Sequence, residues 1–175
     1  MRKVKSFLDG ITESEAFTIL KILTEDDKEI AKRAEQVARE VLSKVDIEEV
    51  AEEVFSDLDN IQVEDLWDSS GRTRGGYVEP CERAGEMFEE TLKPHLEKLK
   101  RYQKLLLHNE AKSFCKGILK GLYKFKEEST TEYAEYVEDE PEEYSKTILE
   151  EWIKSCKNQN HKKEMKKFFE QMEWK

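Results

Sequence analysis

Apolar side chains recur at helical spacing along nearly the whole chain, and this periodicity constrains the fold more than any other feature. Glycine and proline, which disfavour helix interiors, number only seven and three among 175 residues. No long run alternates apolar and polar residues as a half-buried strand does. The sequence therefore predicts an all-α fold of about seven or eight helices in antiparallel pairs, forming a bundle or a short α-solenoid-like array.

Residues that favour a helix start occur at five places. These are Thr12 with Glu15, Thr24, Asp46 with Glu49, Pro80 and Pro141. The first two predicted helices each carry apolar residues on one face, and these residues include Leu20 and Leu23 in the first helix and Ile30, Val37 and Val41 in the second. Such stripes are typical of helices that pack against a neighbour.

Two glycines inside a later predicted helix need an explanation. Gly117 and Gly121 lie four residues apart, on one face of the helix expected around residues 111–125. Glycine in a helix interior costs about 1 kcal/mol relative to alanine. Close approach of another helix is the simplest compensation, because a glycine leaves room where a side chain would stand.

A single glycine-rich segment interrupts the helical pattern. We expect one helical domain over residues 1–175, in which the loop 68–79 divides an N-terminal from a C-terminal helix group. Long loops in compact helical proteins are uncommon and often functional. Because tryptophan, tyrosine and arginine dominate binding hot spots, the candidate partner-binding residues at this loop are Trp67, Arg72, Arg74 and Tyr77.

The same loop also fits a purely structural role. In that interpretation Asp65 or Asp68 pairs with one of the two arginines, and the aromatic residues hold the loop against the protein. The residue types present permit both the binding site and the structural clamp.

Charge and cysteine usage bound the class of protein. The formal net charge is −10, which disfavours non-specific nucleic-acid binding over the whole surface. Local basic groups remain at Arg72 and Arg74 and among the C-terminal lysines, Lys162, Lys163, Lys166 and Lys167. No stretch approaches 18 apolar residues, so no membrane span is expected. Three widely spaced cysteines are typical of reduced thiols, so we expect a cytoplasmic protein.

The residues do not predict a catalytic or metal site. Cys156 and His161 lack further ligands at zinc spacing, and no histidine follows a glutamate at the spacing of di-iron bundles. Cys81 is the best nucleophile candidate, since a helix start lowers a thiol pKa, but no partner base is identifiable. We therefore expect no catalytic residues, no metal, no cofactor and no enzymatic activity.

The middle of the chain resembles a known family. The element Val63-Glu-Asp-Leu-Trp-Asp-Ser-Ser-Gly-Arg-Thr-Arg-Gly-Gly-Tyr-Val78, with the helical residues 45–59 before it and Cys115-Lys-Gly-Ile-Leu-Lys-Gly-Leu-Tyr123 after it, resembles the helical region that accompanies the zinc finger in SWIM zinc-finger proteins. The likeness covers roughly residues 40–128. The finger itself, Cys-x-Cys followed by Cys-x-His, is absent, so the resemblance implies a detached helical module that acts with a finger-bearing partner.

These observations predict a non-enzymatic protein-interaction or scaffold module with a protein partner. The alternative is a nucleic-acid-associated accessory protein, which binds directly through the Arg72 and Arg74 loop or the C-terminal lysines, or acts with a zinc-finger-bearing partner. A second alternative is an enzyme of unknown reaction that uses the loop and Cys81. The oligomeric state is left open.

Overall fold

The structure, a computed structural model, describes residues 7–73 and 76–174. These residues form eight α-helices, two 3-10 helices and two very short strands, which confirms the all-α prediction. The chain divides into two compact units, residues 1–44 and 45–175. This differs from the single domain expected from sequence. The boundary lies after Lys44, whereas the segment 68–79 lies inside the second unit.

The first unit is a short helix and a helical hairpin. It contains η1 (Phe7–Gly10), α1 (Glu13–Asp26) and α2 (Lys28–Leu42), and α1 contacts α2. The predicted capping box starts α1, because the Thr12 backbone N–H donates to Glu15 at 2.8 Å and Glu15 N–H donates back to the Thr12 hydroxyl. The prediction that Thr24 caps the second helix is wrong. Asp27 caps α2 instead.

The second unit holds the other elements. They are α3 (Ile47–Asp59), α4 (Val63–Ser69), β1 (Gly71–Thr73), β2 (Gly76–Val78), α5 (Pro80–Lys104), α6 (His108–Glu128), η2 (Glu132–Tyr136), α7 (Glu140–Ser155) and α8 (Gln159–Glu170). Three of the predicted starts are confirmed: Asp46 caps α3, Pro80 is the first residue of α5, and Pro141 is the second residue of α7.

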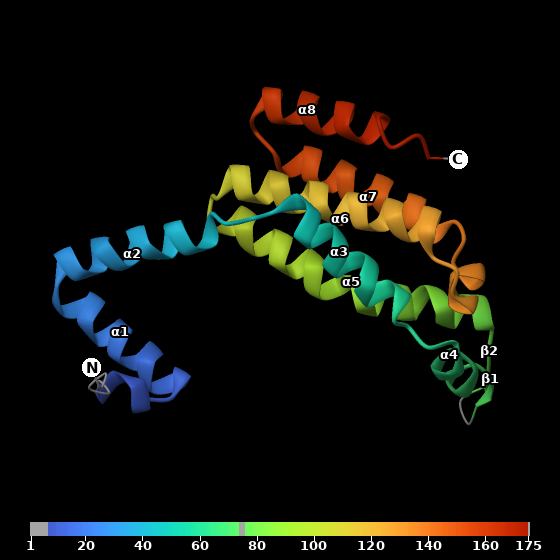
Figure 1. The fold of residues 1–175 in the computed structure, drawn as a ribbon, viewed down its shortest axis with the longest axis horizontal. Coiled ribbons are helices and arrows are strands. Elements are labelled where there is room, and N and C mark those ends of the chain that lie inside the picture. The colour runs from blue at the N-terminus through green and yellow to red at the C-terminus, as the bar shows by residue number, and fades with distance from the viewer. Residues whose placement is uncertain (1–6, 74–75, 175) are drawn as a thin grey trace, which may run out of the picture. The chain divides into compact units, whose positions relative to one another are not determined.

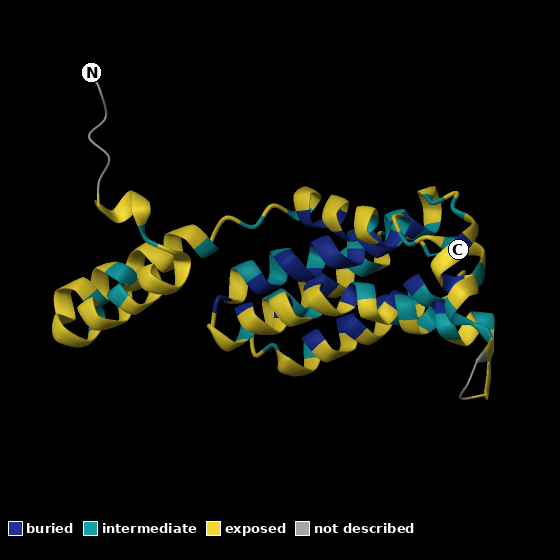
Figure 2. Ribbon diagram, turned by 90° about the horizontal axis from the view of Figure 1, so that it is seen from below, coloured by how far each residue is buried: buried dark blue, intermediate teal, exposed yellow. Residues whose placement is uncertain are grey.

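Helix α6 is the centre of the second unit, where it contacts α3, α5, α7 and α8. Figure 1 shows that α5 and α7 run opposite to α6, whereas α3 runs in the same direction as α6. Nine residues of α6 are buried, among them Phe114, Ile118 and Phe125. The core of the second unit therefore lies on the surfaces where α3, α5 and α7 face α6, which are coloured as buried in Figure 2.

The two glycines of α6 allow α3 to approach closely, as the sequence predicted. A Cβ atom built on Gly117 would lie 2.5 Å from Val50 Cβ, and one built on Gly121 would lie 2.7 Å from the Ala51 carbonyl oxygen. Ion pairs from Lys120 to Glu48 and from Lys124 to Glu52 flank this contact. Exposed ion pairs stabilise little, so the close backbone packing is what defines the α3–α6 interface.

Candidate functional site

Exposed apolar side chains concentrate on the first helical hairpin. No described residue between 7 and 44 is buried, in contrast to the second unit (Figure 2). Of the thirteen large hydrophobic side chains that are exposed among the described residues, seven lie on α1 and α2. We call these seven the N-terminal apolar surface: Phe17, Leu20, Ile22, Leu23, Ile30, Val37 and Val41.

The number of exposed apolar side chains on two short helices separates this surface from ordinary surface hydrophobics. Single exposed apolar residues are common on proteins and need no explanation, but a concentration of them marks an interaction site. Phe17 is 70% exposed and Val41 is 65% exposed, so each presents most of its side chain to solvent. The sequence predicted apolar stripes that contain Leu20, Leu23, Ile30, Val37 and Val41, but neither their exposure nor the contribution of Phe17 and Ile22. Two neighbouring helices can each cover only part of the other, so part of each apolar face stays open.

The predicted loop is a small β-hairpin. Strands β1 and β2 are antiparallel, and their register places Arg72 directly opposite Tyr77. These two strands of three residues each are a minor exception to the all-α pattern among the described residues. Arg72 is exposed and Tyr77 is 66% exposed, so the hairpin presents a cationic and an aromatic side chain together. Arg74 lies outside the described residues.

Trp67 lies on α4, just before the hairpin. Its side chain is 48% exposed, and its indole Nε1 donates to the Tyr136 hydroxyl of η2 at 3.4 Å. The structure therefore ties Trp67 to η2 and pairs Arg72 with Tyr77. No hydrogen bond or ring contact joins Trp67 to Arg72 or Tyr77 among the described residues.

The packing of Leu66 and a hydrogen bond from Arg83 fix the base of the β-hairpin. Leu66 is fully buried, and Arg83 Nε donates to the Ser69 hydroxyl at 3.2 Å. Hydrogen bonds to Glu86 and Glu90 raise the pKa of the Arg83 guanidinium. The predicted clamp, in which Asp65 or Asp68 pairs with an arginine of the loop, is not seen for Arg72 in the described part of the chain.

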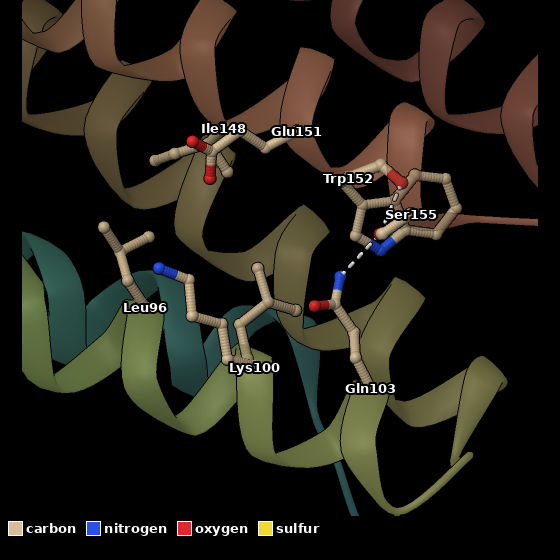
Figure 3. A pocket seen from close by; sticks show the side chains of 8 residues that line it. Leu96, Lys100, Gln103, Ile148, Glu151, Trp152 and Ser155 are labelled. Atoms are coloured by element: carbon tan, nitrogen blue, oxygen red, sulfur yellow. Dashed lines mark hydrogen bonds between the residues drawn. The ribbon is translucent and has the colours of Figure 1, made fainter.

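A groove between α5 and α7 is a further concave feature (Figure 3). It has a volume of about 230 Å³. Leu96, Leu99, Ile148 and Trp152 line it with apolar surface, and Lys100, Gln103, Glu151 and Ser155 line it with polar groups. The Gln103 side-chain amide donates to the Ser155 hydroxyl at 3.1 Å, which links the two helices beside the groove. No sequence signal predicted this groove.

Groups with catalytic potential are dispersed. Cys115 is fully buried in α6, and burial raises the pKa of its thiol. Cys81 is exposed near the start of α5, and no base is hydrogen-bonded to it among the described residues. Within the same residues, no three histidine, cysteine, aspartate or glutamate side chains cluster as metal ligands would. His95 Nε2 lies 2.8 Å from Asp57 Oδ2, which joins α5 to α3.

An acidic corner at the start of α7 contains two carboxyl groups with opposite pKa shifts. Burial, followed by the neighbouring charges of Glu143 and Asp139, raises the pKa of Glu140. Hydrogen bonds from Lys146 and Lys126 lower the pKa of Glu142. These two residues, two positions apart, form a natural pair for a test of electrostatics at this corner.

We expect the variant Glu140→Gln to be more stable than the wild type at neutral pH. Because the folded-state pKa of Glu140 is raised, the wild type loses stability as pH rises from the ordinary glutamate pKa through that raised value. The advantage of glutamine should therefore grow from acidic to neutral pH. Glu142→Gln is the matched control with the opposite sign, since its stabilisation is present at neutral pH and lost as pH falls through its lowered pKa. Denaturant unfolding over a pH series measures the stability of both variants relative to the wild type. A stability difference that changes with pH in the same direction for both variants would contradict this assignment.

Comparisons with models of known families, with curated proteins and with solved structures give no match. The resemblance to the helical region of SWIM zinc-finger proteins therefore stays a prediction. No helix of the described residues is long and apolar enough to cross a membrane.

Proposed function

We propose that this protein is a non-enzymatic protein-interaction module whose main binding face is the N-terminal apolar surface. The observation that carries the proposal is the absence of any buried residue in the described part of the first unit, together with seven large exposed hydrophobics on α1 and α2. Burial of apolar area stabilises association by roughly 25 cal/mol per Å² before the costs of binding are subtracted. Covering this surface is therefore the main source of binding free energy available to the first unit.

The geometry of the α1–α2 hairpin favours a helical partner. Amphipathic helices bind through apolar residues spaced three and four positions apart, and Leu20 and Leu23 on α1 have that spacing. On α2, Ile30, Val37 and Val41 are spaced by seven and four positions, so they lie along one face. Each helix can thus contribute a ridge of side chains to a helix–helix contact.

The β-hairpin is a second contact in this proposal. Arg72 and Tyr77 form an exposed cross-strand pair on a base fixed by Leu66 and Arg83, and Trp67 is half-exposed nearby in sequence. A rigid base lowers the entropy lost when an exposed side chain is immobilised on binding. Arg74 belongs to the same candidate on sequence grounds alone.

Affinity capture with matched variants tests the proposal. The immobilised full chain is compared with Phe17→Glu, which places a charge on the N-terminal apolar surface. The control is Gln36→Glu, which adds the same charge to an exposed position of α2 whose neighbours three and four positions away are all charged. We expect the bound proteins to be lost from Phe17→Glu and retained by Gln36→Glu. Circular dichroism establishes that all three chains are equally folded, and mass spectrometry identifies what was bound.

Other outcomes separate the alternatives. Capture that survives Phe17→Glu and is lost in Arg72→Ala or Tyr77→Ala would move the binding face to the β-hairpin. Capture of nucleic acid that weakens steeply with salt would favour the nucleic-acid-associated alternative, since phosphate contacts release counterions. Equal capture by every variant would contradict the proposal.

A further inference from the structure

We infer that the partner on the N-terminal apolar surface is a second copy of this chain, so that two α1–α2 hairpins pack into a four-helix bundle. The inference rests on the proposed function, because it names the occupant of the same surface. In a two-fold dimer the same patch is used on both chains, and each copy covers the exposed stripes of the other.

The first argument is that the first unit lacks the means to stabilise itself. Below about 70–80 residues, a single hydrophobic core rarely supplies more than about 3–5 kcal/mol of stability, and small units usually add disulfides, a metal or oligomerisation. The first unit has 44 residues and no buried residue among those described. The chain's cysteines are Cys81, Cys115 and Cys156, and its histidines likewise lie beyond residue 44, so no disulfide or histidine–cysteine metal site forms within this unit. Of disulfides, a metal and oligomerisation, only oligomerisation remains as a means of stabilising this unit.

Isolated helices of this length also need packing. Helices α1 and α2 contain 14 and 15 residues. Helices shorter than about 12–15 residues are marginal in water even with favourable sequences, because nucleation is costly. Packing against a second hairpin supplies the tertiary contacts that maintain such helices in proteins.

The distribution of charge favours a second copy over a strongly charged partner. Residues 1–44 contain nine basic and nine acidic side chains, so their formal charge is zero, and residues 45–175 therefore carry the whole net charge of −10. Association of two first units meets no net repulsion, whereas contact between two acidic second units is opposed by like charge. A strongly basic partner would be attracted to the second unit instead.

Within the neutral unit, the two helices are complementary in charge. Helix α1 has four acidic residues and one lysine, whereas α2 has four basic residues and three acidic ones. A two-fold arrangement can place α1 of one chain beside α2 of the other, so that the acidic helix meets the basic helix at both seams. The surface is therefore self-complementary in polarity as well as apolar.

Sedimentation of the full chain over a wide concentration range tests the inference. We expect the mass of the wild type and of Gln36→Glu to rise with concentration from 20.7 kDa toward twice that value. Phe17→Glu and Val41→Glu should remain at the mass of one chain at the same concentrations. Both substituted side chains are more than half exposed within one chain, so their replacement leaves the contacts inside that chain largely intact.

The outcomes separate the inference that the partner is a second copy from the proposal that the N-terminal apolar surface binds a partner at all. A wild-type chain that stays at 20.7 kDa throughout would overturn the second-copy inference, and the capture experiment with Phe17→Glu would then decide the proposed function by itself. A dimer that persists in both Phe17→Glu and Val41→Glu would also overturn it, because the contact would lie on another surface.

Discussion

Phe88→Ala is expected to lower the free energy of unfolding of the second unit by about 3–5 kcal/mol, the range for truncation of a buried aromatic ring. The Phe88 ring on α5 is fully buried. Its centroid lies 6.0 Å from that of Phe125 on α6 and 5.3 Å from that of Tyr144 on α7. Removal of the ring therefore leaves a cavity where three helices meet, and it removes two aromatic contacts.

Tryptophan fluorescence during denaturant unfolding measures this change in the second unit alone, because the three tryptophans are Trp67, Trp152 and Trp174. Phe17→Ala is the matched control, since it makes the same truncation at a ring that is 70% exposed in the first unit. We expect the control to leave the fluorescence transition unchanged. An equal loss of stability in the two variants would contradict the position of Phe88 in the core.

Gly121→Ala is expected to destabilise the protein by about 1–3 kcal/mol, the usual cost of overpacking, despite alanine's better helix propensity. A methyl group at this position would lie 2.7 Å from both the Ala51 carbonyl oxygen and Val54 Cβ of α3. Backbone cannot move aside as a flexible side chain can, so α3 must shift away from α6. The helix-propensity gain of about 1 kcal/mol is too small to offset this displacement.

Gly85→Ala is the matched control for this substitution. Gly85 also lies in a helix, α5, but a methyl group there would meet only the carboxylate end of Glu140, at 3.3 Å. We expect Gly85→Ala to be neutral or stabilising, because the Glu140 side chain can rotate away. Thermal unfolding of the two variants compares them directly, and a stabilising effect of Gly121→Ala would show that α3 does not approach α6 as closely as described.

Sequence periodicity predicted most of the fold because local rules determine helix starts. Thr12, Asp46 and Pro80 act through hydrogen bonds and dihedral angles that involve only the next few residues. The prediction that Thr24 caps α2 was wrong: α1 continues past Thr24, whose hydroxyl donates to the Leu20 carbonyl within that helix. Asp27, which is in an extended conformation, accepts from the Glu29 and Ile30 amides instead. Both residues are permissible caps, and sequence alone does not choose between them.

The candidate surfaces were harder to predict because exposure is a property of the tertiary structure. The stripes that contain Leu20 on α1 and Val37 on α2 have the same periodicity as the buried stripe that contains Phe114 on α6. Periodicity reports that a helix has an apolar face, but it does not report what covers that face. The hairpin that pairs Arg72 with Tyr77 was missed as a pair of strands for a related reason, since strands of three residues are too short for an alternating pattern.

Hydrogen exchange of the full chain at low and high protein concentration tests whether a partner covers the N-terminal apolar surface, because it reports on residues 13–42 separately from the second unit. We expect amides of α1 and α2 to exchange rapidly in dilute protein and to become protected when a partner covers them, while α6 stays protected throughout. Protection of α1 and α2 that is already high in dilute protein and does not change with concentration or with Phe17→Glu would contradict the account. In that case α1 and α2 would be stably folded without any partner on the N-terminal apolar surface.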